Sequence, residues 1–193
     1  TAAGELAAGT PPLTRAGGRP GDVLYVSGTL GEARLGLAQL QAGRRRSPAI
    51  LRQKRPVPRV ALGRLAARFA SAALDLSDGL AQDLGHLCRA SGTGAELDVD
   101  RLPVSRAVRA SLGLEGALAG GEDYELLLAI PPARTSSFER ACLRAEESVT
   151  RVGRLLPGPS GHIQLLGGQD VRLPAGFDHF QGGGRIDRSE REG

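Results

Sequence analysis

Two carboxylates and a hydroxyl lie close together in the stretch "ALDLSDGLAQDLGHL", residues 73–87. If a strand ends near Ser77 and a helix follows, Asp75 and Asp78 can converge at the helix entry. Paired carboxylates are hard oxygen ligands suited to Mg²⁺, which is commonly shared with substrate phosphates. Ser77 can then donate a hydrogen bond to a phosphate beside the helix N-terminus. By spacing alone, a plain N-cap at Ser77 or Asp78 is the commoner explanation, but a carboxylate inside an apolar strand at Asp75 is costly without a partner.

A second acidic group follows two glycines in "GGEDYEL", residues 120–126. The glycines allow the backbone to approach a ligand closely, and Glu122 has the charge to hold a cationic or hydroxyl-bearing substrate. A charged turn without a ligand explains the same residues, because Gly and Asp are frequent in turns.

Two further stretches carry weaker signals. The segment "GTLG", residues 28–31, has the position of a phosphate loop, but the chain contains no GxxxxGK[ST] pattern, so we expect a structural turn there. The segment "GFDHF", residues 176–180, holds two of the four phenylalanines, which favours packing on the core over an aromatic flap above a ligand. The absence of CxxC, HExxH and GxSxG patterns argues against zinc or a serine nucleophile.

The composition is ordinary for a globular chain, with 193 residues, 40% hydrophobic and 24% charged residues. We expect no membrane segment, because no apolar run approaches the roughly 18–20 residues that a membrane helix needs. Cys88 and Cys142 are the only cysteines, which favours a reduced, cytoplasmic setting over a disulfide framework. The net charge of +4 with only 3% aromatic residues fits anionic ligands better than nucleic acid.

The elements that must position these residues alternate between strands and helices. We expect strands at residues 22–29, 73–77, 95–100 and 124–130, and helices at 30–43, 60–73, 80–90, 102–113 and 135–147. A basic loop is expected from Arg44 to Arg59, and a meander of short strands over residues 151–174. This order predicts an α/β (α+β) fold with a single mixed sheet and helices packed on one face.

In this order, the motifs resemble the C-terminal part of thiamine-monophosphate kinases, in the aminoimidazole ribonucleotide synthetase-like superfamily. The matching stretches are "LTRAGGRPGD", "PVPRV", "ALDLSDGLAQDLGHL", "SGTGAELDVDRLPVS", "ALAGGEDYELLLAIP" and "GFDHF", within residues 4–180. The pair DxSDGL and GGEDYEL separates these kinases from other members of the superfamily. The resemblance implies direct in-line phosphoryl transfer from ATP to thiamine monophosphate, giving thiamine diphosphate, with several Mg²⁺ ions and no phosphoenzyme.

The resemblance also implies roles for six residues. They are the metal ligands Asp75 and Asp78, the ATP contacts Arg15 and Ser77, and the substrate contacts Glu122 and Phe177. Phosphoryl transfer needs positioning and charge neutralisation more than a nucleophilic side chain, which agrees with this set.

Members of this family carry a preceding N-terminal domain with more acidic Mg²⁺ ligands and most of a homodimer interface. On that basis residues 1–20 are its remnant and exit, residues 21–180 are the C-terminal kinase domain, and residues 181–193 are a disordered tail. We expect the 193 residues alone to be inactive, because half of the ATP site would lie in the other domain. The alternatives are a truncated, non-catalytic domain that binds a ligand or partner, and another ATP-activating enzyme of the superfamily.

Overall fold

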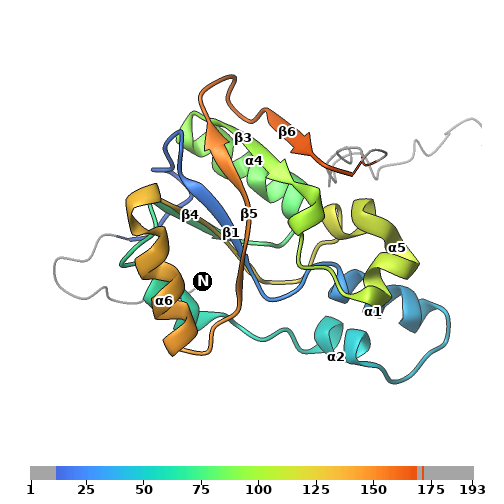
Figure 1. The fold of residues 1–193 in the computed structure, drawn as a ribbon. Coiled ribbons are helices and arrows are strands. Elements are labelled where there is room, and N and C mark those ends of the chain that lie inside the picture. The colour runs from blue at the N-terminus through green and yellow to red at the C-terminus, as the bar shows by residue number, and fades with distance from the viewer. Residues whose placement is uncertain (1–11, 169–170, 172–193) are drawn as a thin grey trace, which may run out of the picture.

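A mixed six-stranded sheet forms the centre of the structure, a computed structural model that describes residues 12–168 and 171 (Figure 1). The strands are β1 (Val23–Ser27), β2 (Ala72–Asp75), β3 (Gly94–Asp98), β4 (Leu126–Ile130), β5 (Val149–Leu156) and β6 (Ile163–Leu166). The helices are α1 (Glu32–Gln41), α2 (Pro48–Lys54), α3 (Val60–Ala66), α4 (Leu80–Ser91), α5 (Arg106–Leu118) and α6 (Thr135–Arg144), with 3-10 turns η1 (Val99–Arg101) and η2 (Pro132–Arg134). The strand order is β2-β4-β1-β5-β3-β6, and neighbours are antiparallel except β3 and β6. The predicted class, one mixed sheet with helices, is confirmed.

The strand β1 is buried throughout, and its side chains alternate between two cores. Leu24 and Val26 belong to a large core shared with residues of α1, α4 and α5. Val23 and Tyr25 belong to a smaller core with residues of α3 and α6. The expected layer of helices on one face is therefore present, and the structure adds a second layer on the other face. A strand that is buried at every position has cover on both faces of the sheet.

The helix α4 carries the apolar stripe that the sequence predicts. Leu80, Leu84, Leu87 and Cys88 are each no more than 1% exposed, as expected for one buried helix face. This stripe fixes α4 on the sheet, and it fixes with it the acidic turn that precedes the helix.

The expectation of a loop over residues 44–59 was wrong, because α2 forms within this stretch. The Ser47 hydroxyl accepts a hydrogen bond from the N–H of Ile50, and Pro48 occupies the first turn. Ser at the N-cap and Pro at the first position are a strong helix start. Pro48 does not break this helix, because a proline in the first turn needs no backbone N–H donor.

Two other boundaries differ from expectation. The helix predicted over residues 60–73 ends at Ala66, because Ala72–Asp75 pair with β4 as an edge strand. The described part of residues 151–174 does not form the predicted meander, since β5 and β6 lie on opposite sides of β3 and do not pair with each other. Within the described ranges, no helix is both long enough and apolar enough to cross a membrane.

Candidate functional site

The turn from Asp75 to Gly79 connects the edge strand β2 to α4. Asp75 is exposed at the end of β2, Leu76 is buried, and Ser77 and Asp78 are half-buried. The exposure of Asp75 removes the cost that a carboxylate inside an apolar strand would carry. The two carboxylates and the hydroxyl are thus presented at the end of an edge strand, where a ligand can reach them.

Neither Ser77 nor Asp78 caps α4, so the plain helix-cap explanation of this turn was wrong. Gly79 is the N-cap residue, with φ 108° and no side-chain cap bond. A Cβ at Gly79 would lie 2.9 Å from backbone atoms of Leu118 and Ala119, which leaves room for glycine alone. The N-cap position itself is therefore taken by glycine, while the Asp78 carboxylate accepts a 3.5 Å hydrogen bond from Nε2 of Gln82 in the first turn of α4.

The buried carboxylate of Asp83 holds the turn in shape from within α4. Its Oδ2 accepts hydrogen bonds from the backbone N–H of Ser77 at 2.9 Å and of Asp78 at 3.0 Å. Burial raises the pKa of Asp83 above its ordinary value, although the two backbone hydrogen bonds act in the opposite direction. This role of Asp83 was not predicted from the sequence. Its signal was an acidic residue directly before Leu84, on the apolar side of the helix.

Asp78, Asp83 and His86 place possible ligand atoms within 4.8 Å of one another. Mg²⁺ prefers carboxylate oxygens to imidazole nitrogen, and Asp83 already accepts two backbone hydrogen bonds. The donors that fit Mg²⁺ best at this turn are therefore the carboxylates of Asp78 and Asp75. Asp75 is outside the 4.8 Å group, so convergence of Asp75 and Asp78 on one ion stays a prediction.

The loop at residues 120–125 runs along the acidic turn and is joined to it by backbone hydrogen bonds. The N–H of Glu122 donates to the carbonyl of Ser77 at 2.8 Å, and the N–H of Tyr124 donates to the carbonyl of Leu76 at 3.0 Å. A Cβ on Gly121 would lie 2.5 Å from the Ser77 carbonyl oxygen, so the close approach requires glycine. Glu122 and Tyr124 have φ values of 67° and 50°, a costly conformation that is frequent at functional sites. The fold thus places the two acidic motifs side by side.

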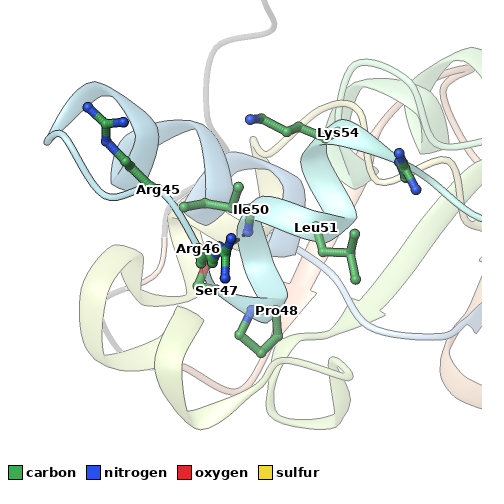
Figure 2. Close-up of a pocket in the computed structure, with 8 residues that line it drawn as sticks. Arg45, Arg46, Ser47, Pro48, Ile50, Leu51 and Lys54 are labelled. Carbon is green, nitrogen blue, oxygen red and sulfur yellow. Dashed lines mark hydrogen bonds between the residues drawn. The ribbon is translucent and has the colours of Figure 1, made fainter.

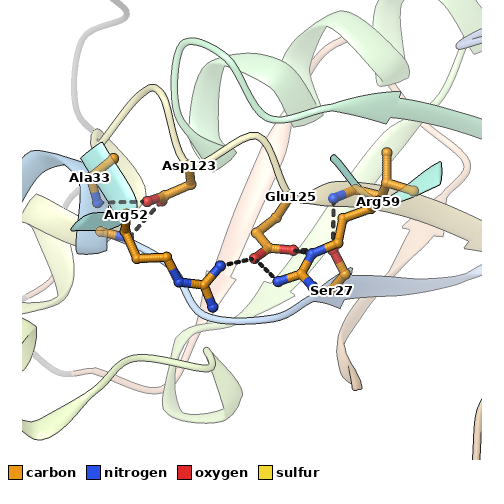
Figure 3. A network of polar contacts seen from close by, with 8 residues as sticks. Ser27, Ala33, Arg52, Arg59, Asp123 and Glu125 are labelled. Carbon is orange, nitrogen blue, oxygen red and sulfur yellow. Dashed lines mark hydrogen bonds and ion pairs between the residues drawn. The ribbon is translucent and has the colours of Figure 1, made fainter. Parts of the chain in front are cut away.

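The loop contains three carboxylates, and that of Asp123 caps the N-terminus of α1 (Figure 3). It accepts hydrogen bonds from the N–H of Gly31 at 2.6 Å and of Ala33 at 3.1 Å. Burial raises the pKa of Asp123 to about 6, despite these two backbone bonds. The "GTLG" segment is a structural turn, as expected, and a carboxylate of the protein occupies the helix N-terminus that a phosphate loop would offer to a ligand.

The carboxylate of Glu125 forms a buried ion pair (Figure 3). The Arg59 guanidinium donates from Nε at 2.7 Å and from Nη2 at 2.6 Å, and Ser27 donates from its hydroxyl at 2.5 Å. Arg52 approaches to 3.7 Å. A Cβ on Gly28 would lie 2.1 Å from this carboxylate, so the strand end beside it must be glycine. The negative charge of Glu125 is thus balanced by two arginines that the sequence analysis assigned to a solvated loop.

The third carboxylate, that of Glu122, is exposed and is held by a neutral group. Gln53 of α2 donates from Nε2 to Oε2 of Glu122 at 2.6 Å. Because an amide donor carries no charge, this contact leaves the negative charge of Glu122 intact. Among the three carboxylates of the loop, Glu122 is therefore the best placed to meet a cationic ligand.

The segment that contains Arg15 runs beside the edge strand. The carbonyl of Thr14 accepts a hydrogen bond from the N–H of Ala73 in β2, and the carbonyl of Arg15 accepts one from the Ser91 hydroxyl. The Arg15 side chain is exposed, and its backbone contact is with Ser91, at the opposite end of α4 from the turn at residues 75–79. The structure therefore does not bring Arg15 together with Asp75 and Asp78 through a direct contact among the described residues. The predicted substrate contact Phe177 lies outside the described residues, as does the whole "GFDHF" segment.

The mixed sheet and its acidic edge define a known class of protein domain. The sequence model of the family described as "AIR synthase related protein, C-terminal domain" matches residues 19–165, and the chain belongs to this family.

Within that class, the chain is most usefully compared with thiamine-monophosphate kinases, as its motifs suggested. It is 40% identical to the thiamine-monophosphate kinase of Salmonella typhimurium over 87% of this chain and 55% of that protein. The crystal structure of thiamine-monophosphate kinase from Stenotrophomonas maltophilia superposes with a TM-score of 0.73 at 36% identity, covering 79% of this chain and 52% of that one. A structure of AaThiL complexed with AMPPCP and TMP superposes with a TM-score of 0.72 at 33% identity, covering 87% and 54%. The chain thus spans about half the length of the relatives it matches.

Proposed function

We propose that this chain supplies one part of an active site in which ATP phosphorylates thiamine monophosphate to thiamine diphosphate, with the help of Mg²⁺. The observation that carries the proposal is the backbone pairing of the turn at residues 75–79 with the loop at residues 120–125. This pairing gathers Ser77, Asp78 and Glu122 at one edge of the sheet. The similarity to thiamine-monophosphate kinases supports the same reaction.

The acidic turn is suited to the phosphate end of the reaction. Asp75 and Asp78 would hold Mg²⁺, which when bound neutralises charge on the transferring phosphoryl group. Ser77 would donate its hydroxyl to ATP, and the exposed Arg15 would pair with a nucleotide phosphate, as a guanidinium does well. The relative complexed with AMPPCP, an ATP analogue, and TMP supports ATP as the phosphoryl donor.

The loop at residues 120–125 is suited to the other substrate. Thiamine monophosphate carries a positively charged thiazolium ring next to its phosphate ester. The Glu122 carboxylate is exposed and keeps its charge, so it would orient the substrate through that cation. Phe177 would lie against the ring system. Positioning of this kind is the main contribution of a protein to phosphoryl transfer, since the acceptor oxygen itself is the nucleophile.

The remainder of the site is assigned to residues outside this chain. This chain spans only about half the length of the relatives that contain the matching domain. We therefore expect the 193 residues alone to bind ATP weakly and not to turn over.

The test is a product assay with the full gene product that contains this chain. With ATP and Mg²⁺ present, we expect conversion of thiamine monophosphate to thiamine diphosphate, and no phosphorylation of unphosphorylated thiamine. A panel of other ATP-activated acceptors of the superfamily, such as formylglycinamidine ribonucleotide, tests the main alternative. Turnover of one of those acceptors without thiamine diphosphate formation would contradict the proposal.

A further inference from the structure

The short helix α2 faces two different surroundings. Its outer face lines an open hollow of about 670 Å³, together with the arginines that precede and follow the helix (Figure 2). Its inner face turns Arg52 and Gln53 toward the loop at residues 120–125, where they contact Glu125 and Glu122. The helix therefore joins the basic segment to the candidate site, although the sequence offered no role for that segment.

The position of Gln53 is fixed by the way α2 packs on α1. A Cβ on Gly36 of α1 would lie 2.2 Å from the carbonyl oxygen of Ala49 and 2.9 Å from Cβ of Gln53. The two helices thus touch through a glycine, which permits very little sliding. Ala49 and Ile50 are buried beside this contact. Gln53 is accordingly presented to the loop from a rigid element.

Of the two polar atoms of the Gln53 amide, the nitrogen forms a hydrogen bond and the oxygen forms none among the described residues. The nitrogen, Nε2, donates to the Glu122 carboxylate at 2.6 Å, while the oxygen, Oε1, is buried. A buried unpaired oxygen is costly. Because the Glu122 carboxylate can only accept, the amide must turn its donor toward it, and the contact with Glu122 sets this orientation.

The neutrality of Gln53 matters because of what lies beside it. The neighbouring Arg52 and Arg59 both contribute to the balance of the Glu125 charge, and a third cation at position 53 would also compensate Glu122. An amide restrains the Glu122 carboxylate by a charge-assisted hydrogen bond, which is stronger than a bond between neutral groups. It adds no positive charge.

We propose that Gln53 is a positioning residue, which fixes the carboxylate of Glu122 and leaves its charge uncompensated for the cationic ring of the substrate. This inference rests on the proposed function, because it assigns the Glu122 charge to thiamine monophosphate. The residue acts through Glu122 and is not itself in contact with reacting atoms.

The experiment uses the full gene product and measures thiamine monophosphate affinity by titration calorimetry. Q53M removes the donor at similar size, Q53K keeps a donor but adds a charge, and K54M is the control on the exposed side of the same helix. We expect Q53M and Q53K each to weaken binding by about tenfold, with K54M unchanged. In the E122Q background, Q53M should have no further effect.

The proposal would be overturned if Q53M bound thiamine monophosphate with wild-type affinity. It would also be overturned if the double variant Q53M/E122Q lost affinity by the product of the two single losses. Wild-type affinity in Q53K would overturn the part that concerns charge. A second readout is independent of substrate: the NMR signal of the Gln53 side-chain amide should shift in E122Q and not in K54M. If the wild-type protein fails to bind thiamine monophosphate, the proposed function fails, and this signal still decides whether Gln53 holds Glu122.

Discussion

The backbone N–H of Glu122 donates a 2.8 Å hydrogen bond to the carbonyl oxygen of Ser77, and this bond joins two acidic motifs that lie far apart in the sequence. The bond is possible because Gly121 has no side chain to collide with the same carbonyl oxygen. The geometry of the candidate site therefore depends on backbone contacts as much as on its carboxylates.

Substitution of Gly121 tests this contact directly. Gly121→Ala would place a Cβ 2.5 Å from the Ser77 carbonyl oxygen, so the loop and the turn must separate. We expect a loss of about 1–3 kcal/mol in the free energy of unfolding, as for other overpacked sites. Chemical denaturation measures it. Gly63→Ala, in helix α3, is the matched control: a Cβ there would lie 3.8 Å from a side-chain carbon of Leu126, and this change should stabilise the protein by roughly 0.5–1 kcal/mol. Equal effects at both positions would contradict the close approach.

The Asp83 carboxylate should protect two specific amides. Asp83→Ala leaves the N–H groups of Ser77 and Asp78 without their acceptor, and we expect a loss of about 1–3 kcal/mol in stability. Hydrogen exchange of those two amides should accelerate more than exchange in β1. Asp83→Asn, which retains one side-chain oxygen, should restore part of the protection. Unchanged exchange at Ser77 and Asp78 in the alanine variant would show that the turn is held by other contacts.

The ion pair of Glu125 with Arg59 is the most costly polar contact to break. Arg59→Met removes two hydrogen bonds from a carboxylate whose residue is only 1% exposed. We expect a loss of about 3–5 kcal/mol in the free energy of unfolding, because the buried charge loses its main partner. Arg55→Met, four residues earlier and exposed, should change stability by no more than about 0.5 kcal/mol. A small loss in Arg59→Met would mean that Arg52 suffices to balance the charge.

The Asp123 carboxylate gives a pH dependence of defined sign. Its pKa is raised from 3.8 to about 6 in the folded protein, so the folded state binds the proton more tightly than the unfolded state. The contribution to stability is fully present below about pH 4 and is lost as the pH rises through about 6. Relative to Asp123→Asn, the wild-type free energy of unfolding should fall by about 2 kcal/mol across that range and then level off. Parallel stability curves for the two proteins would rule out a raised pKa at Asp123.

The pattern of apolar residues predicted the main elements well. The stripe from Leu80 to Cys88 and the apolar run of β1 determine which surfaces must be buried, and both are buried as expected. Burial of this kind follows from periodicity along a single segment. The strand expected at residues 73–77 is present as β2, Ala72–Asp75. The pairing of β6 with β3 in place of a local meander was not predicted, because it depends on a partner far away in the chain.

The candidate site shows the same division. The residue types and spacing of Asp75, Ser77 and Asp78 pointed to the turn. The glycines of the second motif were expected to approach a ligand, and the structure shows that Gly121 approaches the Ser77 carbonyl instead. The sequence did not indicate that Asp83 shapes the turn, or that Arg59 and Gln53 hold Glu125 and Glu122. The contacts of Arg59 and Gln53 join segments far apart in the chain, so only the three-dimensional structure brings these partners together. Asp83 lies only six residues after Ser77, and its role depends on how the turn folds back against α4.

The most direct test of the proposed kinase site is the rate of thiamine diphosphate formation by the full gene product carrying Asp75→Asn. Asp75 is exposed at the end of β2, so its loss should leave the fold intact. We expect a decrease of about 100-fold or more, because charge stabilisation by a metal is worth several kcal/mol and each 1.36 kcal/mol is tenfold in rate. Glu146→Gln, an exposed acidic residue beyond α6, is the control and should keep the wild-type rate. A near-normal rate in Asp75→Asn would contradict its role as a Mg²⁺ ligand.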